Sequence, residues 1–170
     1  VLSDGGVHSH IDHMIETANA LEARGLQVRL HLFGDGRDVA PKSALTYLTH
    51  LEGAIGPNTS VATLTGRYFS LDRDNRWERV EQGYNVIAKG EGARVTRTEQ
   101  AIRSAYDAEI TDEFIPATVI GDYVGLQAGD GLMFMNYRAD RAREILSAIG
   151  DPDFTSFDTG DRVELSALVG

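Results

Sequence analysis

The stretch VRLHLFGDGRDVAPKSALTYLTHLEGAIGPNTSVATL, residues 28–64, decides the fold of this chain. Its first part, Val28–Phe33, alternates apolar with polar side chains, which predicts a β-strand. After the loop GDGRDVAP, a helix is predicted from about Pro41, because leucines recur at helical spacing and proline suits the first helical turn. Ser60–Leu64 predicts a second strand. A strand, a helix and another strand in this order favour a parallel pair joined by a helical crossover.

The rest of the chain continues this alternation. Helical spacing predicts helices over residues 9–24, 77–88, 99–108 and 139–149, and β-rich runs predict strands over 117–120, 131–136 and 164–169. We therefore expect a single α/β domain, residues 1–170, built as a three-layer α/β/α sandwich with a mostly parallel, mixed sheet. Residues 117–136 are irregular and could add an antiparallel pair to this sheet.

Composition narrows the possible function classes. The chain has 170 residues, a net charge of −10 and no cysteine, which excludes disulfides and thiolate metal sites. Its acidic balance argues against a nucleic acid or an anionic membrane as partner, and we expect a cytoplasmic protein. Both ends, Val1-Leu2 and Glu164–Gly170, resemble pieces of strands, so we expect a part of a longer protein, truncated at both ends.

Arginines gather in GRYFSLDRDNRWERV, residues 66–80. Each guanidinium presents a planar set of donors that matches carboxylate and phosphate oxygens. Arg67 and Arg73 flank the loop and are the better candidates for binding an anion. Arg76 and Arg79 fall on the predicted helix, where pairing with neighbouring carboxylates is the simpler interpretation, and Trp77 is expected in the core. A solvated loop with internal ion pairs is the alternative.

Two further segments combine glycine with acidic or imidazole side chains. In SDGGVHSHIDH, residues 3–13, the glycines favour a tight turn near a ligand, and the histidines could contact that ligand, cap the helix or bind a metal. Their spacing matches a metal site poorly. In DGRD, residues 35–38, Arg37 could hold an anion while Asp38 exchanges a proton with a substrate hydroxyl. The alternative for DGRD is an ordinary turn.

A fourth segment, NYRADRAR, opens the predicted helix 139–149. Arg138 and Arg141 are three residues apart and share one helix face, beside helix amides that favour anions. Arg143 points elsewhere and should be solvated. All four polar segments lie between a predicted strand and a predicted helix. Because ligands of open α/β sheets bind beyond the carboxyl ends of the strands, we expect these segments to converge on one pocket.

Together these segments resemble the cofactor-independent (2,3-bisphosphoglycerate-independent) phosphoglycerate mutase family, in the family's order and over nearly the whole chain. The resemblance implies an isomerase of glycolysis and gluconeogenesis that interconverts 3-phosphoglycerate and 2-phosphoglycerate through a phosphoserine. It implies two α/β domains: one similar to alkaline phosphatase, with the serine and two divalent metals, usually manganese, and an inserted substrate-binding domain. This chain resembles the inserted domain. No segment matches the serine nucleophile or the metal ligands, so the fragment alone is expected to be inactive and to bind no metal.

The resemblance also implies roles for single residues. His8 would lie against the transferring phosphoryl group, and Asp38 would shuttle the proton as catalytic acid and base. The remaining substrate-binding residues would be Arg37, Arg67, Arg73, Arg138 and Arg141. The partners implied are phosphoglycerate and the missing phosphatase-like domain. Two alternatives stay open: a domain of another phosphomutase of the alkaline phosphatase superfamily, and a stand-alone module that binds phosphate or carboxylate.

Overall fold

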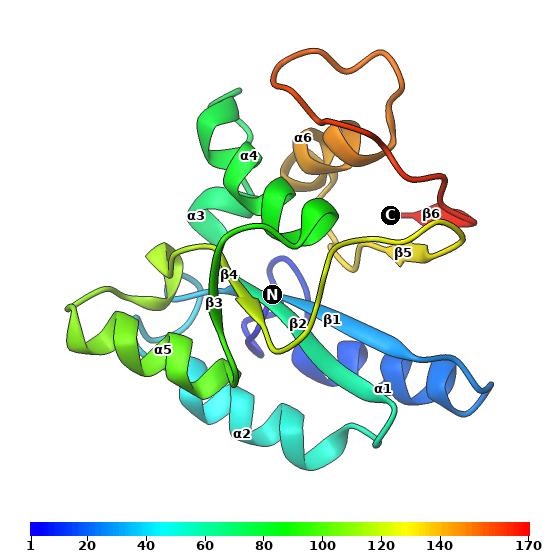
Figure 1. Ribbon diagram of the computed structural model, residues 1–170. Helices are drawn as coiled ribbons and strands as arrows, with labels where there is room; N and C mark the ends of the chain where they lie inside the picture. Colours follow the sequence, from blue (N-terminus) through cyan, green and yellow to red (C-terminus); the bar gives the residue numbers. More distant parts are fainter.

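Four strands form one mixed sheet in the computed structural model, which describes residues 1–170 (Figure 1). They lie in the order β1–β2–β4–β3, with bounds β1 Val28–Gly34, β2 Thr59–Gly66, β3 Ala93–Val95 and β4 Thr118–Ile120. β1 and β2 are parallel, as are β3 and β4, whereas β2 and β4 are antiparallel. The predicted mostly parallel, mixed sheet is therefore confirmed.

Helices cover both faces of this sheet and complete the three-layer sandwich (Figure 1). One face carries α1 Ile11–Glu22, α2 Ala44–Ala54 and α5 Thr98–Asp107, whose apolar sides pack on Leu32 and Leu64 in the larger core cluster. The other face carries α4 Trp77–Tyr84, the π turn η1 Asn85–Lys89 and α6 Ala139–Gly150, which pack on Phe33 and Val119. No helix is long and apolar enough to cross a membrane.

Some element boundaries differ from the sequence predictions. α2 begins at Ala44 rather than near Pro41, because the amides of Ser43 and Ala44 donate to the Asp112 carboxylate at 2.8 and 2.9 Å. β4 pairs with β2 and not with a neighbouring strand in 131–136. β5 Gly131–Met133 and β6 Ala167–Val169 are shorter than predicted and form a separate parallel pair.

A short 3-10 turn, η2 Asp112–Phe114, lies across the carboxyl ends of β1 and β2. A Cβ at Gly34 would lie 2.3 Å from the carbonyl oxygen of Asp112, and one at Gly66 would lie 2.2 Å from that of Glu113. Only glycine fits at these two strand ends, since any side chain would collide with backbone. The turn thereby fixes the points at which the loops after β1 and β2 leave the sheet.

Candidate functional site

Arg67, the first residue of the short helix α3 Arg67–Ser70, lies at the centre of the candidate site. Its Nη1 donates to Asp35 Oδ1 at 2.6 Å and to Asp38 Oδ2 at 2.5 Å. Asp35 also accepts a hydrogen bond from Ser3 Oγ at 2.5 Å. Three loops therefore meet here: the N-terminal loop, the loop after β1 and the segment after β2.

The Asp35 carboxylate is the buried anchor of this meeting point, since only 2% of it is exposed. Burial by itself raises the pKa of Asp35, but the hydrogen bonds from Ser3, the Asp38 amide and Arg67 outweigh it and leave this pKa below its ordinary value. Asp35 is therefore ionised at neutral pH and holds Arg67 in place. Asp38 shares the same guanidinium but is more open, with 18% of its side chain exposed.

His8 lies beside Asp38 and is almost fully buried. Its Nε2 is 3.9 Å from Asp38 Oδ2, and its Nδ1 is buried without a hydrogen-bond partner. Burial lowers the pKa of His8, and the Arg67 guanidinium lowers it further. His8 is therefore neutral near pH 7, and its Nδ1 has no hydrogen-bond partner within the chain.

Residues 136–141, which lie far along the chain from the other three segments, also contact the site. The Tyr137 amide donates to the His8 carbonyl oxygen at 2.6 Å, and Arg141 Nη1 donates to the Leu71 carbonyl oxygen at 2.8 Å. Arg73 Nη1 donates to Asp140 Oδ2 at 2.8 Å. These bonds tie the fourth predicted segment to two of the others, so the segments meet, and a shared substrate pocket stays a prediction.

Positive charge is crowded at this point. Burial lowers the pKa of Arg141, and the guanidinium groups of Arg73 and Arg67 lower it further. Arg141 Nε is buried without a partner, and the side chains of Arg73 and Arg138 are each 44% exposed, so they remain accessible. Cations that face one another beside unpaired buried nitrogens are suited to an anion with several oxygens, such as a phosphate or a carboxylate.

Arg37 lies apart from the other predicted site residues. Its side chain is 65% exposed and its Nη1 is 3.3 Å from Glu113 Oε1, on η2. The sequence did not suggest this partner, because Glu113 lies far along the chain. Nothing in the structure tests the predicted contact between Arg37 and a substrate, which stays a prediction.

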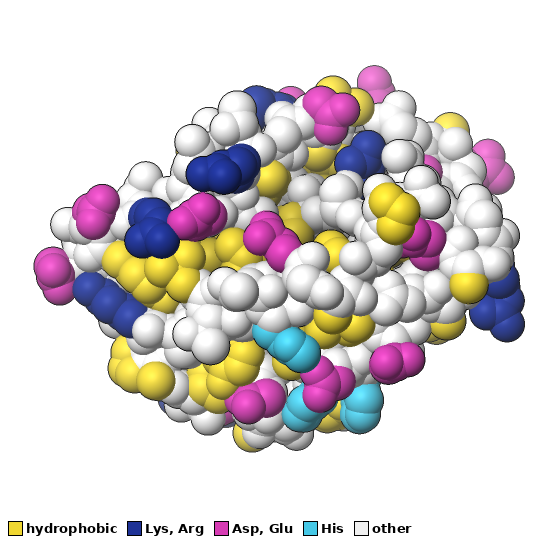
Figure 2. Space-filling view, turned by 90° about the horizontal axis from the view of Figure 1, so that it is seen from below, with side chains coloured by type: hydrophobic (Ala, Val, Ile, Leu, Met, Phe, Trp, Pro, Cys, Tyr) yellow, Lys and Arg dark blue, Asp and Glu magenta, His cyan; other side chains and the backbone are white.

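Of the other histidines of the first segment, His13 contacts the Tyr137 hydroxyl of segment 136–141 at 2.5 Å, whereas His10 lies outside the site. His10 is 3.7 Å from Asp12, and His50 Nε2 of α2 donates to Asp12 Oδ1 at 2.8 Å. Figure 2 shows histidines beside acidic side chains on the face seen from below. No group of three His, Asp or Glu side chains is arranged to hold a metal ion. The exposed cluster instead links α1 to α2.

Arg79 and Arg143 take the structural roles that the sequence suggested, whereas Arg76 is exposed at the N-cap of α4 and contacts Asp72 only through its backbone amide. Arg79 is 3.5 Å from Asp72 Oδ1 and stacks over the Tyr68 ring at 3.9 Å, while Arg143 is exposed on α6. Trp77 packs against the smaller core cluster. Sequence reasoning missed Ser3 and Asp35 as site residues. The position of Asp35, directly after a buried strand, was the available signal, although Asp-Gly also reads as an ordinary turn.

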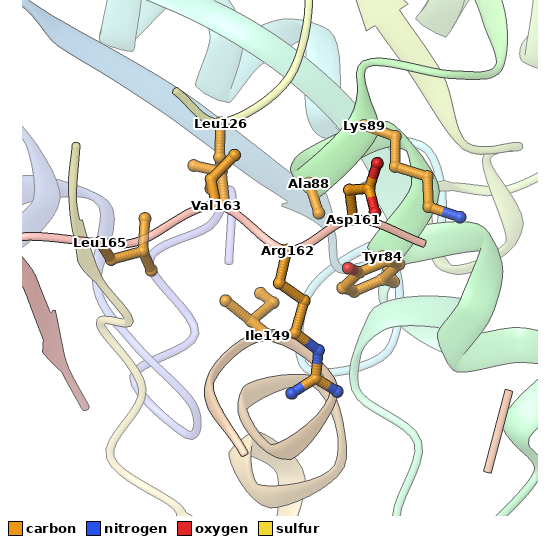
Figure 3. Close-up of a pocket in the computed structure, with 9 residues that line it drawn as sticks. All are labelled: Tyr84, Ala88, Lys89, Leu126, Ile149, Asp161, Arg162, Val163 and Leu165. Carbon is orange, nitrogen blue, oxygen red and sulfur yellow. The ribbon is translucent and has the colours of Figure 1, made fainter. Parts of the chain in front are cut away.

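A small cavity of about 20 Å³ lies elsewhere, between η1, α6 and the chain after α6 (Figure 3). It is lined by Tyr84, Ala88, Lys89, Leu126, Ile149, Asp161, Arg162, Val163 and Leu165. It contains none of the converging residues, and its volume admits about one water molecule. It is therefore not a substrate site.

Comparison with known proteins agrees with this geometry. The family model described as BPG-independent PGAM N-terminus matches residues 1–170, the whole chain. This chain belongs to that family. Curated relatives named 2,3-bisphosphoglycerate-independent phosphoglycerate mutase include one from Ruegeria sp. (strain TM1040), 52% identical over 171 residues, and one from Agrobacterium fabrum, 47% identical over 170 residues. In both cases the match covers all of this chain but 34% of the relative.

The fold of this BPG-independent mutase N-terminal family is also present in a solved structure. The phosphoglycerate mutase of Leishmania mexicana, determined at low cobalt concentration, superposes with a TM-score of 0.91 at 28% identity. The match covers 98% of this chain and 33% of the other. The chain thus spans about a third of the length of the relatives that it matches.

Proposed function

We propose that this chain is the substrate-binding domain of a cofactor-independent phosphoglycerate mutase that interconverts 3-phosphoglycerate and 2-phosphoglycerate. The observation that carries the proposal is the joining of four loops around Arg67, His8 and Arg141, which leaves unpaired buried nitrogens among crowded cations. A phosphoglycerate carries two anionic groups on three carbons and suits such a site. The family membership supplies the substrate class.

The reaction needs the glycerate to stay bound while the phosphoryl group leaves and returns. Arg138 and Arg141 would bind phosphate and carboxylate oxygens, and Arg73 and Arg67 would hold further oxygens of the substrate. Arg67 Nη1 already donates to Asp35 and Asp38, so the other N–H groups of this guanidinium would bind the ligand. Arg37 would reach the carboxylate end after leaving Glu113.

Asp38 would move the proton. Its carboxylate lies between Arg67 and His8, and it is partly exposed toward the site. It would take a proton from one glycerate hydroxyl and return it to the other, as general base and then general acid. Neutral His8 would contact the transferring phosphoryl group through its unpaired Nδ1.

The rest of the chemistry would come from outside this chain. We propose an inserted domain whose partner, similar to alkaline phosphatase, supplies the phosphoserine and two divalent metals, with manganese expected. The residues here do not fit such metals, because no three ligand-type side chains are grouped to hold one. A glycolytic reaction would place the whole enzyme in the cytoplasm.

Calorimetric titration of this chain with 3-phosphoglycerate tests the proposal. Arg138→Ala should weaken binding roughly ten- to a hundredfold, the range for one charged hydrogen bond. Arg143→Ala is the matched control, because this arginine is exposed on the same helix. Equal affinities for Arg138→Ala and Arg143→Ala would refute the assignment. No turnover of 3-phosphoglycerate by the isolated chain is expected, and turnover would mean that it holds a nucleophile of its own.

A further inference from the structure

Two carboxyl groups of α6, one helical turn apart, hold the loop that carries Arg73. Asp140 Oδ2 accepts a hydrogen bond from Arg73 Nη1 at 2.8 Å, and Glu144 Oε1 accepts one from the Asn75 backbone amide at 3.0 Å. Asn75 has a positive φ of 56°, which is uncommon for a residue other than glycine. α6 therefore contacts this loop both at the Arg73 side chain and at the backbone of its positive-φ residue.

Glu144 lies in an unusual place for a carboxylate. It is 8% exposed and lies beside the carboxyl group of Asp72, which is 5% exposed. Asp72 Oδ2 accepts the amides of Asp74 and Arg76 at 2.9 and 3.0 Å, and Arg79 lies 3.5 Å from its Oδ1. These donors keep Asp72 ionised. Glu144 Oε2, in contrast, is buried and has no donor directed at it.

A proton on Glu144 resolves this arrangement. Two ionised carboxylates side by side repel one another when they are buried, which raises the pKa of one of them. A protonated Glu144 would donate its hydrogen to Asp72 while its other oxygen still accepts a hydrogen bond from the Asn75 amide. One neutral acid would thus link α6 to both ends of the loop.

We propose that Glu144 is a positioning residue that holds the Arg73 loop as a neutral acid, and that its ionisation loosens this loop. The consequence for substrate binding rests on the proposed function, in which Arg73 contacts phosphoglycerate. The effect on the loop itself does not depend on any ligand.

The charges around Glu144 set the direction of the pH dependence. Burial raises the pKa of Glu144, the Asn75 amide opposes this, and the negative charges of Asp72 and Asp74 raise it further. Arg79 faces Asp72 and stabilises the ionised form of that partner. Because the pKa of Glu144 is higher in the folded chain, the neutral link is complete below its ordinary value of 4.5 and is lost as the pH rises through the folded value.

Glutamine tests the proposal because it imitates the neutral acid. Glu144→Gln can accept from the Asn75 amide and donate to Asp72 at every pH, whereas Glu144→Ala can do neither. In the wild-type chain the NMR resonance of the Asn75 amide should move with pH, with a midpoint above the ordinary value for a glutamate. That movement should persist in the control Glu16→Gln, an exposed carboxyl on α1, and vanish in Glu144→Gln. An identical titration of this amide in wild type and Glu144→Gln would overturn the proposal.

Ligand binding provides the second measurement. The ratio of the dissociation constants of wild type and Glu144→Gln for 3-phosphoglycerate should rise about tenfold from acidic to alkaline pH, as expected for loss of one buried hydrogen bond. The ligand's own titration cancels in this ratio. A constant ratio despite measurable binding would overturn the link to Arg73. A chain that binds no ligand at any pH would refute the proposed function alone, and the amide titration would still decide the role of Glu144.

Discussion

Replacing Arg67 by alanine removes the only cation bonded to Asp35. Arg67 is 6% exposed, and its Nη1 lies 2.6 Å from Asp35 Oδ1 and 2.5 Å from Asp38 Oδ2. The truncation leaves Asp35, 2% exposed, with hydroxyl and amide donors but no opposite charge. Breaking a buried ion pair in this way costs about 3–5 kcal/mol. Since 1 kcal/mol shifts the melting temperature of a domain of this size by about 2–4 °C, we expect a loss of roughly 6–20 °C.

Urea unfolding measures this loss, with the single tryptophan, Trp77, as the fluorescent probe. Arg143→Ala is the control, because it removes an exposed arginine and should change the free energy of unfolding by less than about 0.5 kcal/mol. Introducing Arg67→Ala into Asp35→Asn should cost less than it does in the wild type, because no buried charge is then left unpaired. An unfolding midpoint for Arg67→Ala equal to that of Arg143→Ala would refute the reasoning.

The same ion pair predicts a specific acid dependence. The pKa of Asp35 lies below its ordinary value of 3.8 in the folded chain. Its contribution to stability is therefore complete above pH 3.8 and is lost as the pH falls through the folded value. The difference in the free energy of unfolding between wild type and Arg67→Ala should narrow over that acidic range.

Three other predictions follow from single contacts. Gly66→Ala should lower the free energy of unfolding by about 1–3 kcal/mol or more, because its Cβ would lie 2.2 Å from a carbonyl oxygen. Gly53→Ala in α2 meets nothing within 4 Å and should raise that free energy by about 0.5–1 kcal/mol. Thermal melting compares the two variants. Burial lowers the pKa of His31 to about 4. The free energy of unfolding of the wild type should therefore fall by about 3 kcal/mol between pH 6.5 and pH 4, as measured by urea titration. His31→Gln should not show this pH-dependent loss. Glu113→Gln frees Arg37 from its ion pair and should change the calorimetric affinity for 3-phosphoglycerate, and an unchanged affinity would argue against a role for Arg37 in binding.

Local patterns of the chain were enough to predict the longer helices and the strands β1, β2 and β4, but not the short elements β3, α3 and η2 or the roles of Ser3 and Asp35. Alternation in Val28–Phe33 and helical spacing in Ala44–Ala54 record which side of each element faces the core, and neighbouring residues carry that information. The position of DGRD and of Arg67 directly after β1 and β2 placed both at the carboxyl edge of the sheet. Their convergence then follows from the geometry of parallel strands.

Tertiary structure alone decided how each of these side chains is used. Arg67 and Arg37 are both arginines in polar loops, yet one is enclosed between two carboxylates and the other is exposed beside Glu113. The start of α2 depends on Asp112, and the Arg73 loop depends on Glu144, both distant in sequence. Periodicity carries no information about such partners, because they are selected by which elements pack together. Burial and the pairing of charges arise only when the elements pack together. They determine the pKa of each group and which hydrogen-bond donors are left without a partner.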